Sequence, residues 1–421
     1  MIKRYATEEI SKIFSEEYKM KVWLIVEQTV ARVQEEKKIV PSGLSKKLGK
    51  IKVDPKRVEA IENITNHDVI AFLEAVREKI GSQSRWLHFG MTSYDLVDTA
   101  WALILRQAFD AVSREIDKLL QVLKKLAKKY KNTPQIGRTH GVFAQPITFG
   151  YKIKSWYQEI LRCKIRIQRA RNEISYGKLS GAVGSYTIIA PEVEKNVMKR
   201  LGLKPEPVST QVIPRDRHAY LLTQLVFYGC ALERIATEIR NLSRSEIGEV
   251  AEPFARGQKG SSAMPHKQNP ITCERICGLV KVLRGYLIPA FENINLWHER
   301  DLTNSSVERI IIPDAFHIIH YSTKKMIWVL ENLRVFPEKM MENIQNSLGL
   351  YASQYLMNKL IEKGMSRKLS YDLVQKLSFK AIAEKKNLKT LAESDSQVTQ
   401  YLTLSDIEKI FDLKWFLRNI L

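Results

Sequence analysis

The stretch LRQAFDAVSREIDKLLQVLKKLAKKY, residues 105–130, decides the fold class of this chain. Its apolar residues recur at alternating steps of four and three residues, which gathers them on one side of an α-helix. The residues of this stripe are Leu105, Phe109, Val112, Ile116, Leu119, Leu123, Leu126 and Tyr130. A stripe of this length is typical of a helix that packs lengthwise against partner helices.

The same spacing recurs elsewhere in the chain. It predicts helices over residues 153–174, 221–242 and 319–336. A fifth helix is predicted to begin after Asn269, which can cap it, and to extend to Leu287, since Pro270 suits a first turn. Long helices with such stripes pack at shallow crossing angles. The chain is therefore predicted to be all-α, built around a long central helical bundle.

The length of 421 residues leaves room for two or three structural parts. We expect residues 1–105 to form an N-terminal helical domain, residues 106–364 the central bundle and residues 365–421 a C-terminal helical domain. The start of the chain alternates charged and apolar residues instead of forming a secretory h-region, and no apolar run is long enough to span a bilayer. A cytoplasmic protein is expected.

The chain is strongly basic, with 67 Lys and Arg residues against 46 Asp and Glu residues and a net charge of +21. Such a charge is compatible with nucleic-acid binding, or with a lysine-rich surface that reserves some cations for an anionic small molecule. The densest basic run, KKLAKKYK at 124–131, lies on the first predicted helix, which favours a solvated face. The four cysteines include no CxxC pair, which favours buried thiols over a metal or redox site.

Polar segments that carry reactive residues separate the predicted helices. They are NHDV (66–69), HFGMTSYD (88–95), IGRTHG (136–141), SGAVGSY (180–186), STQVIPRDRHA (209–219), GSSAMPHKQNP (260–270) and WHERDLTNSSVER (297–309). His67, His88 and His140 each lie in such a segment, and histidine titrates near neutrality, which suits acid–base chemistry. Thr92 and Ser93 precede a predicted helix start, where they serve either as N-caps or as donors to a phosphate or carboxylate.

The segment GSSAMPHKQNP places two hydroxyls, a histidine, a lysine and an asparagine between a glycine and two prolines. That composition is poor for a helix or strand and suits a loop that closes over an anion. Gly257 and Gly260 favour a mobile loop whose closure would exclude water. GAVG at 181–184 indicates a turn that reverses the chain. The chain has no Walker loop, and HERDL at 298–302 lacks the second histidine of a zincin.

Together these segments resemble the fumarase/aspartase superfamily and, within it, the adenylosuccinate lyases. The signature GSSxMPxKxNP is matched at every fixed position, and the histidine before Lys267 is typical of adenylosuccinate lyases. Arg4-Tyr5, NHDV, HFGMTS, RTHG, STQVIPRDRH and WHERDLTNSSVER also match, in family order from residue 4 to residue 309. The resemblance implies a three-part, nearly all-helical subunit in a homotetramer whose active sites each take residues from three subunits.

The resemblance implies β-elimination of fumarate, from adenylosuccinate to give AMP and from succinyl-AICAR to give AICAR, in purine nucleotide biosynthesis. Such a site needs a base for the proton beside a carboxylate, cations and N–H donors for the developing charge, and an acid for the leaving nitrogen. No step of that chemistry requires a metal or a cofactor. The resemblance thus implies small-molecule substrates and a homotetramer as partners. No membrane partner is expected, and nucleic acid is not an expected partner.

The family match also implies roles for individual residues. Ser261 would be the general base, His140 the general acid, and Glu274 would orient and charge a histidine, with Lys267 and His67 completing the catalytic set. The substrate-binding residues implied are Arg4, Tyr5, His67, Asp68, Val69, His88, Thr92, Ser93, Gln211, Ser262, Lys267, Asn269, Arg300, Ser305 and Arg309.

Two positions depart from the family pattern: Gln268 stands where a basic residue is frequent, and Arg275 where asparagine is frequent. We expect the Gln268 side chain to point away from substrate. Two alternatives are compatible with the sequence. One is another lyase of the superfamily, such as an argininosuccinate lyase; the other is a basic helical scaffold that binds nucleic acid through a dead active site. The intact acid, base and lysine positions favour the enzyme.

Overall fold

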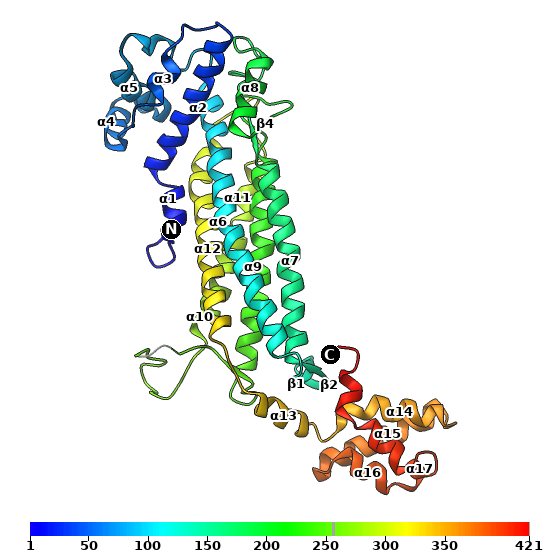
Figure 1. Cartoon of the computed structure of the whole chain (residues 1–421). Helices are drawn as coiled ribbons and strands as arrows, with labels where there is room; N and C mark the ends of the chain where they lie inside the picture. The colour runs from blue at the N-terminus through cyan, green and yellow to red at the C-terminus, as the bar shows by residue number, and fades with distance from the viewer. Residues whose placement is uncertain (255–256, 421) are drawn as a thin grey trace. The chain divides into compact units, whose positions relative to one another are not determined.

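The computed structural model describes residues 1–254 and 257–420, and most of them are helical (Figure 1). The chain divides into two compact units, each assembled from three stretches. The first unit comprises Met1–Lys118, Ile160–Glu233 and Ile276–Lys325, and the second comprises Leu119–Glu159, Arg234–Arg275 and Met326–Leu421. Across the described ranges, no helix combines the length and the apolar character needed to cross a membrane. The all-α prediction is confirmed.

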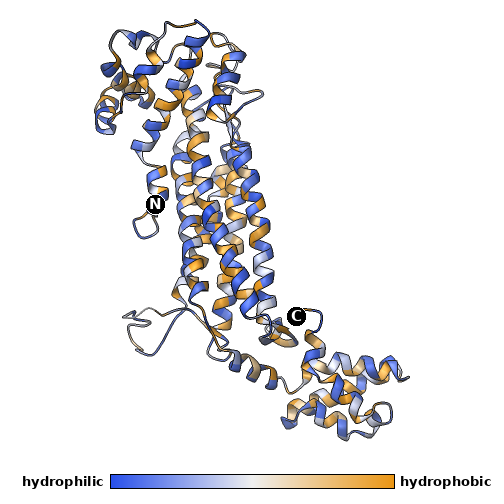
Figure 2. Cartoon of the chain, viewed as in Figure 1, coloured by the Kyte–Doolittle hydropathy of each residue, from blue (hydrophilic) through white to orange (hydrophobic). Residues whose placement is uncertain are grey.

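Five long helices form the frame of the chain and carry the predicted apolar stripes. They are α6 (Ser93–Lys129), α7 (Phe149–Glu173), α9 (Asp216–Leu242), α10 (Ile271–Gly285) and α12 (Thr303–Glu331). Figure 2 shows hydrophobic and hydrophilic residues alternating along these helices. Phe109, Val112 and Ile116 of the first stripe are fully buried. Polar contacts join the helices within the first unit, including the Tyr228–Thr323 hydroxyl pair at 2.9 Å.

The structure corrects two predicted helix boundaries. The helix expected over residues 319–336 ends at Glu331, because Arg334–Val335 form strand β6 against strand β5 (Val250–Ala251). Helix α10 ends at Gly285, so Leu287 begins a separate helix, α11 (Leu287–Glu292).

The predicted cap of α10 is also wrong. The backbone N–H groups of Thr272 and Cys273, in the first turn, donate to the Glu252 carboxylate at 3.0 and 2.7 Å. The Asn269 side-chain amide instead donates to the carbonyl of Gly260 at 3.0 Å. A carboxylate is the stronger partner at this end, because the helix dipole favours negative charge there.

Shorter elements complete the first unit. They are α1 (Glu8–Ile13), α2 (Glu16–Glu36), α3 (Leu44–Leu48), α4 (Pro55–Thr65), α5 (Asp68–Ile80), the 3-10 helix Gly81–Trp86, β3 (Tyr176–Gly177), α8 (Pro191–Leu201) and β4 (Lys204–Pro205). Trp23 of α2 packs edge-on against Phe72 of α5, with ring centroids 5.3 Å apart. Strands β3 and β4 pair in parallel. The predicted turn at GAVG is confirmed, with Gly181 and Gly184 at φ values of +82° and +84°.

The second unit contains a β-hairpin and a helical C-terminal cluster. The hairpin joins β1 (Pro134–Thr139) and β2 (Val142–Thr148). The other elements are α13 (Pro337–Gln345), the 3-10 helix Leu350–Ala352, α14 (Ser353–Glu362), α15 (Arg367–Glu384), α16 (Leu388–Ser394), α17 (Ser396–Thr399), α18 (Leu404–Ile410) and α19 (Leu413–Leu417). Leu356, Ala381 and Leu388 are fully buried in the core of this cluster. The three-domain division stays a prediction, and α6 continues unbroken through its boundary at residue 105.

The turn at residues 181–184 yields a matched pair of glycine substitutions. A Cβ on Gly184 would lie 1.9 Å from the carbonyl oxygen of Ser209, whereas a Cβ on Gly181 would meet nothing within 4 Å. Both residues have positive φ, so both substitutions strain the backbone. We expect Gly184→Ala to lower the free energy of unfolding by about 3 kcal/mol or more, against about 1–2 kcal/mol for Gly181→Ala. Urea denaturation followed by circular dichroism measures both; equal losses would contradict the close approach.

Candidate active site

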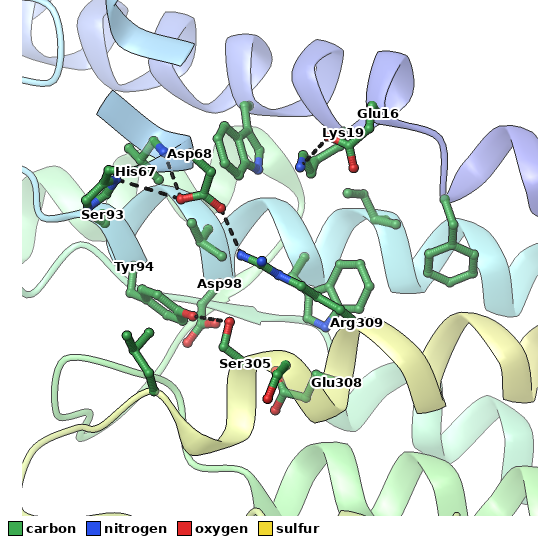
Figure 3. A pocket seen from close by; sticks show the side chains of 18 of the residues that line it. Glu16, Lys19, His67, Asp68, Ser93, Tyr94, Asp98, Ser305, Glu308 and Arg309 are labelled. Atoms are coloured by element: carbon green, nitrogen blue, oxygen red, sulfur yellow. Dashed lines mark hydrogen bonds and ion pairs between the residues drawn. The ribbon is translucent and has the colours of Figure 1, made fainter. Parts of the chain in front are cut away.

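A cavity of about 760 Å³ lies in the first unit, bounded by α2, the α4–α5 junction, α6 and the first half of α12 (Figure 3). It collects side chains from sequence segments that are far apart. The predicted site residues that line it are His67, Asp68, Val69, Ser93, Arg300, Ser305 and Arg309. These seven residues therefore share one cavity, and their contact with substrate stays a prediction.

The N-terminus of α5 presents His67 and Asp68 to this cavity. The His67 Nδ1 atom accepts the backbone N–H of Ile70 at 3.3 Å, so His67 is the N-cap of the helix. The Asp68 carboxylate accepts a hydrogen bond from the backbone N–H of Val69 at 2.8 Å. It also pairs with the Arg309 guanidinium at 3.0 Å. Figure 3 shows this pair reaching across from α5 to α12.

Arg300 and Gln211, both predicted from sequence, meet directly. The Arg300 guanidinium donates to Gln211 Oε1 at 2.7 Å and stacks over the Tyr94 ring, 3.6 Å from its centroid. The Tyr94 hydroxyl donates in turn to Ser305 Oγ at 3.3 Å. Within the described part of the chain, the buried Nε–H of Arg300 has no hydrogen-bond partner. A buried, unsatisfied cationic donor beside a cavity is the feature expected where an anion binds.

A buried ion network that the sequence did not reveal supports the floor of the cavity. Arg215 contacts Asp98 of α6 at 2.8 Å and Glu308 of α12 at 2.9 Å. Burial acts to raise the pKa of both carboxyls. At Asp98 the attraction of Arg215 outweighs burial, so the pKa is lowered below its ordinary value. At Glu308 burial outweighs Arg215, so the pKa is raised. Burial, together with the Arg215 charge, lowers the pKa of nearby His218 to about 3. The network therefore locks α6 to α12 around one permanent cation.

A second buried pair fixes the start of α6. Asp95 accepts the backbone N–H of Thr92 at 2.9 Å and forms an ion pair at 2.5 Å with Lys178, both side chains being 0% exposed. Lys178 also donates to the carbonyl of Gly181 at 3.2 Å. The turn that carries Thr92 and Ser93 is therefore tied to the SGAVGSY segment. Ser93 is the first residue of α6, one residue earlier than the predicted helix start, and it lines the cavity.

Five predicted residues in this unit lie outside the lining of the cavity: Arg4, Tyr5, His88, Thr92 and Gln211. His88, with a φ of +60°, pairs through Nδ1 with the buried Glu27 carboxylate at 2.6 Å. Arg4 is exposed, and Tyr5 packs edge-on against Tyr321 with ring centroids 5.4 Å apart. Thr92 is not a lining residue, but it lies next to Ser93, which is one. Their contact with substrate stays a prediction.

His140 occupies a hairpin turn in the second unit. Thr139 pairs with Val142, so the turn contains only His140 and Gly141, at φ values of +54° and +79°. Positive φ at both central residues defines a type I′ turn. The hairpin is anchored from behind, where Gln135 and Arg138 donate to the fully buried Glu249 carboxylate at 2.6 and 2.7 Å. The His140 side chain is exposed at the tip of an anchored hairpin.

The signature segment, residues 260–270, forms a loop whose backbone N–H groups donate to the hydroxyl of its first serine. Ser261 Oγ accepts the backbone N–H groups of Ala263 at 3.3 Å and Met264 at 3.1 Å. A Cβ on Gly260 would lie 1.9 Å from the carbonyl oxygen of Lys267, so only glycine fits this closure. Two N–H donors aimed at one hydroxyl oxygen favour its anionic form.

The remaining predicted residues of this segment also lie in the second unit. Ser262 and Lys267 are exposed along the loop, and Glu274 is exposed in the first turn of α10. The Gln268 side chain accepts from Arg334 of β6 at 2.5 Å, which ties the loop to the sheet. Arg275 is half-buried. Among the residues that the structure describes, no group of three or more His, Cys, Asp or Glu side chains could hold a metal ion.

Comparison with known proteins decides the family. A family model described as "Lyase" matches residues 3–285, and one described as "Adenylosuccinate lyase C-terminus" matches residues 349–420. The adenylosuccinate lyase of Thermotoga maritima is 45% identical over 421 residues, covering 100% of this chain and 98% of that protein. The adenylosuccinate lyase of Aquifex aeolicus is 48% identical over 423 residues, covering 100% and 97%. The chain belongs to the adenylosuccinate lyase family.

Solved structures agree with the lyase fold. A fumarate lyase from Mesorhizobium superposes with a TM-score of 0.90 at 24% identity, covering 100% of this chain and 97% of that one. The 3-carboxy-cis,cis-muconate lactonizing enzyme of Pseudomonas putida gives 0.88 at 24% identity, covering 99% and 95%. At this identity the likeness shows the fold alone. The predicted membership of the fumarase/aspartase superfamily is confirmed, and the chain is a lyase.

The His88–Glu27 pair gives this lyase a pH-dependent contribution to stability. Burial lowers the pKa of His88, but Glu27 outweighs burial and the pKa is raised above its ordinary value. The pair therefore stabilises the fold fully below about pH 6.5 and less as pH rises through the raised pKa. We expect Glu27→Gln to cost about 1–3 kcal/mol at about pH 6 and less at about pH 9. Urea denaturation at both pH values measures the difference; a cost that grew with pH would contradict the pairing.

Proposed function

We propose that this lyase removes fumarate from adenylosuccinate, giving AMP, and from succinyl-AICAR, giving AICAR. The observation that carries the proposal is the Ser261 hydroxyl, which accepts two backbone N–H bonds inside the signature loop. A serine is a weak base unless its alkoxide is stabilised. From the sequence, loop N–H groups and Lys267 are the candidates for that role, and the N–H groups of Ala263 and Met264 are suited to it.

In the proposed reaction the Ser261 alkoxide takes a proton from the carbon beside the outer carboxylate of the succinyl group. The electron pair left on that carbon forms the double bond of fumarate as the carbon–nitrogen bond breaks. His140 donates a proton to the departing nitrogen. Lys267 and Asn269 hold the carboxylates, whose negative charge grows as the proton leaves, and Glu274 orients and charges a histidine of the site.

The cavity of the first unit suits the nucleotide end of these substrates. Arg300 offers a buried Nε–H with no acceptor in the described chain, and Ser93 and His67 lie at the N-termini of α6 and α5. N–H groups at helix starts favour phosphate and carboxylate oxygens. We assign Arg300, Ser305 and Arg309 to the phosphate and ribose, with His67 and Asp68 beside them.

We further propose that active sites are shared among copies in a homotetramer that acts in the cytoplasm. The assigned residues divide between the two units: His67, Ser93, Arg300 and their neighbours belong to the first, whereas His140 and Ser261 belong to the second. Membership of the fumarase/aspartase superfamily supports completion of each site by neighbouring copies. Light scattering of the purified protein tests the tetramer.

Ser261→Ala is expected to bind substrate and to lose turnover, because the proton acceptor is gone. We expect kcat to fall by about 100- to 10,000-fold with KM little changed. Ultraviolet absorbance of adenylosuccinate follows the reaction. Ser262→Ala is the matched control, since it removes the neighbouring hydroxyl and should lose far less. Near-normal turnover of Ser261→Ala would sink the base assignment.

His140→Gln is expected to lower kcat by about 100-fold or more, because the leaving nitrogen loses its proton donor. A rise in KM alone would make His140 a binding residue instead. Mixing inactive His140→Gln with inactive Ser261→Ala tests the shared site. If the acid and the base of one site come from different copies, subunit exchange restores part of the turnover. No gain on mixing would place both in the same copy.

A further inference from the structure

Two buried carboxylates flank strand β5 in the second unit. Glu249 precedes Val250–Ala251 and is 0% exposed, and Glu252 follows it and is 6% exposed. Carboxylates buried this deeply are costly unless donors surround them. Neither is among the residues that the resemblance assigns to the reaction. Their partners therefore reveal what they do.

The Glu249 carboxylate is hydrogen-bonded to the hairpin and to α13. It accepts from Gln135 Nε2 at 2.6 Å, from Arg138 Nη2 at 2.7 Å and from Asn343 Nδ2 at 2.8 Å. Gln135 and Arg138 both belong to β1, which leads into the His140 turn. Arg138 neutralises the buried charge, and only one residue separates it from His140.

The Glu252 carboxylate is hydrogen-bonded to the segment that follows the signature loop. It accepts the backbone N–H groups of Thr272 and Cys273, at 3.0 and 2.7 Å, with one oxygen for each. These donors lie in the first turn of α10, directly after Asn269 and Pro270, where the loop ends. Negative charge at this position also interacts favourably with the helix dipole.

Backbone geometry explains why the two carboxylates serve different segments. In extended backbone successive side chains point to opposite sides, so residues three apart face away from each other. Strand β5 is fixed in turn by antiparallel pairing, Val250 with Val335 and Ala251 with Arg334. Residues 249–252 thus hold two segments from one short paired strand.

We propose that Glu249 and Glu252 are paired positioning residues, which hold the hairpin turn of His140 and the end of the Ser261 loop from one short strand. The inference rests on the proposed function, because it gives both carboxylates their purpose through the acid and the base. Both residues are buried, and the oxygens of each carboxylate accept donors from the segment that it holds. Each sets the position of a group assigned to the reaction.

The full-length protein with Glu249→Gln or Glu252→Gln tests the proposal. An amide in place of either carboxylate removes the charge and turns an –NH₂ group toward existing donors. Glu342→Gln is the matched control, since Glu342 is an exposed glutamate of α13 whose carboxylate pairs with Lys339. Should Glu249→Gln fail to fold, Asn343→Ala removes a single donor from Glu249 and tests the same contact.

Hydrogen–deuterium exchange separates positioning from general destabilisation. We expect Glu249→Gln to speed exchange in residues 134–148 and to leave residues 257–275 unchanged, and Glu252→Gln to do the reverse. We expect kcat to fall by about 10- to 100-fold in both variants, with KM within about twofold, since small misplacements of reacting groups cost rate rather than binding. Glu342→Gln should match the unaltered protein in both measurements.

Exchange that rises equally in both segments, or in neither, would overturn the proposal. Selective exchange with full turnover would also overturn it, because the anchored segments would not then govern the reaction. Failure of the proposed function has a different signature: the unaltered protein would release no fumarate from adenylosuccinate. The two failures are therefore distinguishable in one set of experiments.

Discussion

A buried carboxylate is costly unless hydrogen-bond donors or cations surround it. This requirement fixes the position of the segments that carry the proposed chemistry. Asp95 holds the start of α6, Asp98 holds Arg215, Glu249 holds the hairpin and Glu252 holds the first turn of α10. The apolar stripes of the long helices supply the frame, but apolar contacts are not directional. Hydrogen bonds to buried charges are directional, and they decide where the loops lie.

The same pairing shapes the electrostatics of the cavity. Lys19 pairs with Glu16, Arg309 with Asp68, and Arg215 with both Asp98 and Glu308. Each of these cations is largely cancelled by its partner. Arg300 instead contacts a neutral amide and an aromatic ring, with its Nε–H unsatisfied within the described chain. Preference for an anion in this cavity therefore depends chiefly on Arg300.

The sequence predicted the long helices because a 3/4 apolar period is a local signal. The hairpin of His140 carries no comparable signal, since His-Gly lacks the Asn-Gly or Asp-Gly pattern of type I′ turns. The sequence assigned the cap of α10 to Asn269, which lies next to the helix. The carboxylate that caps it, Glu252, lies 20 residues upstream of Thr272, so no local pattern could indicate it. Arg215 and Asp98 are 117 residues apart. The family motifs supplied the site residues, but only the fold shows which side chains hold them.

Hydrogen bonds within the signature loop close it on itself. Asn269 binds the Gly260 carbonyl, Lys267 donates its backbone N–H to Met264, and Ser261 binds the loop from within. Each of these bonds restricts the conformations that the backbone of the segment can adopt. Ordering it around a substrate then consumes little conformational entropy, so more of the interaction energy remains for affinity and rate.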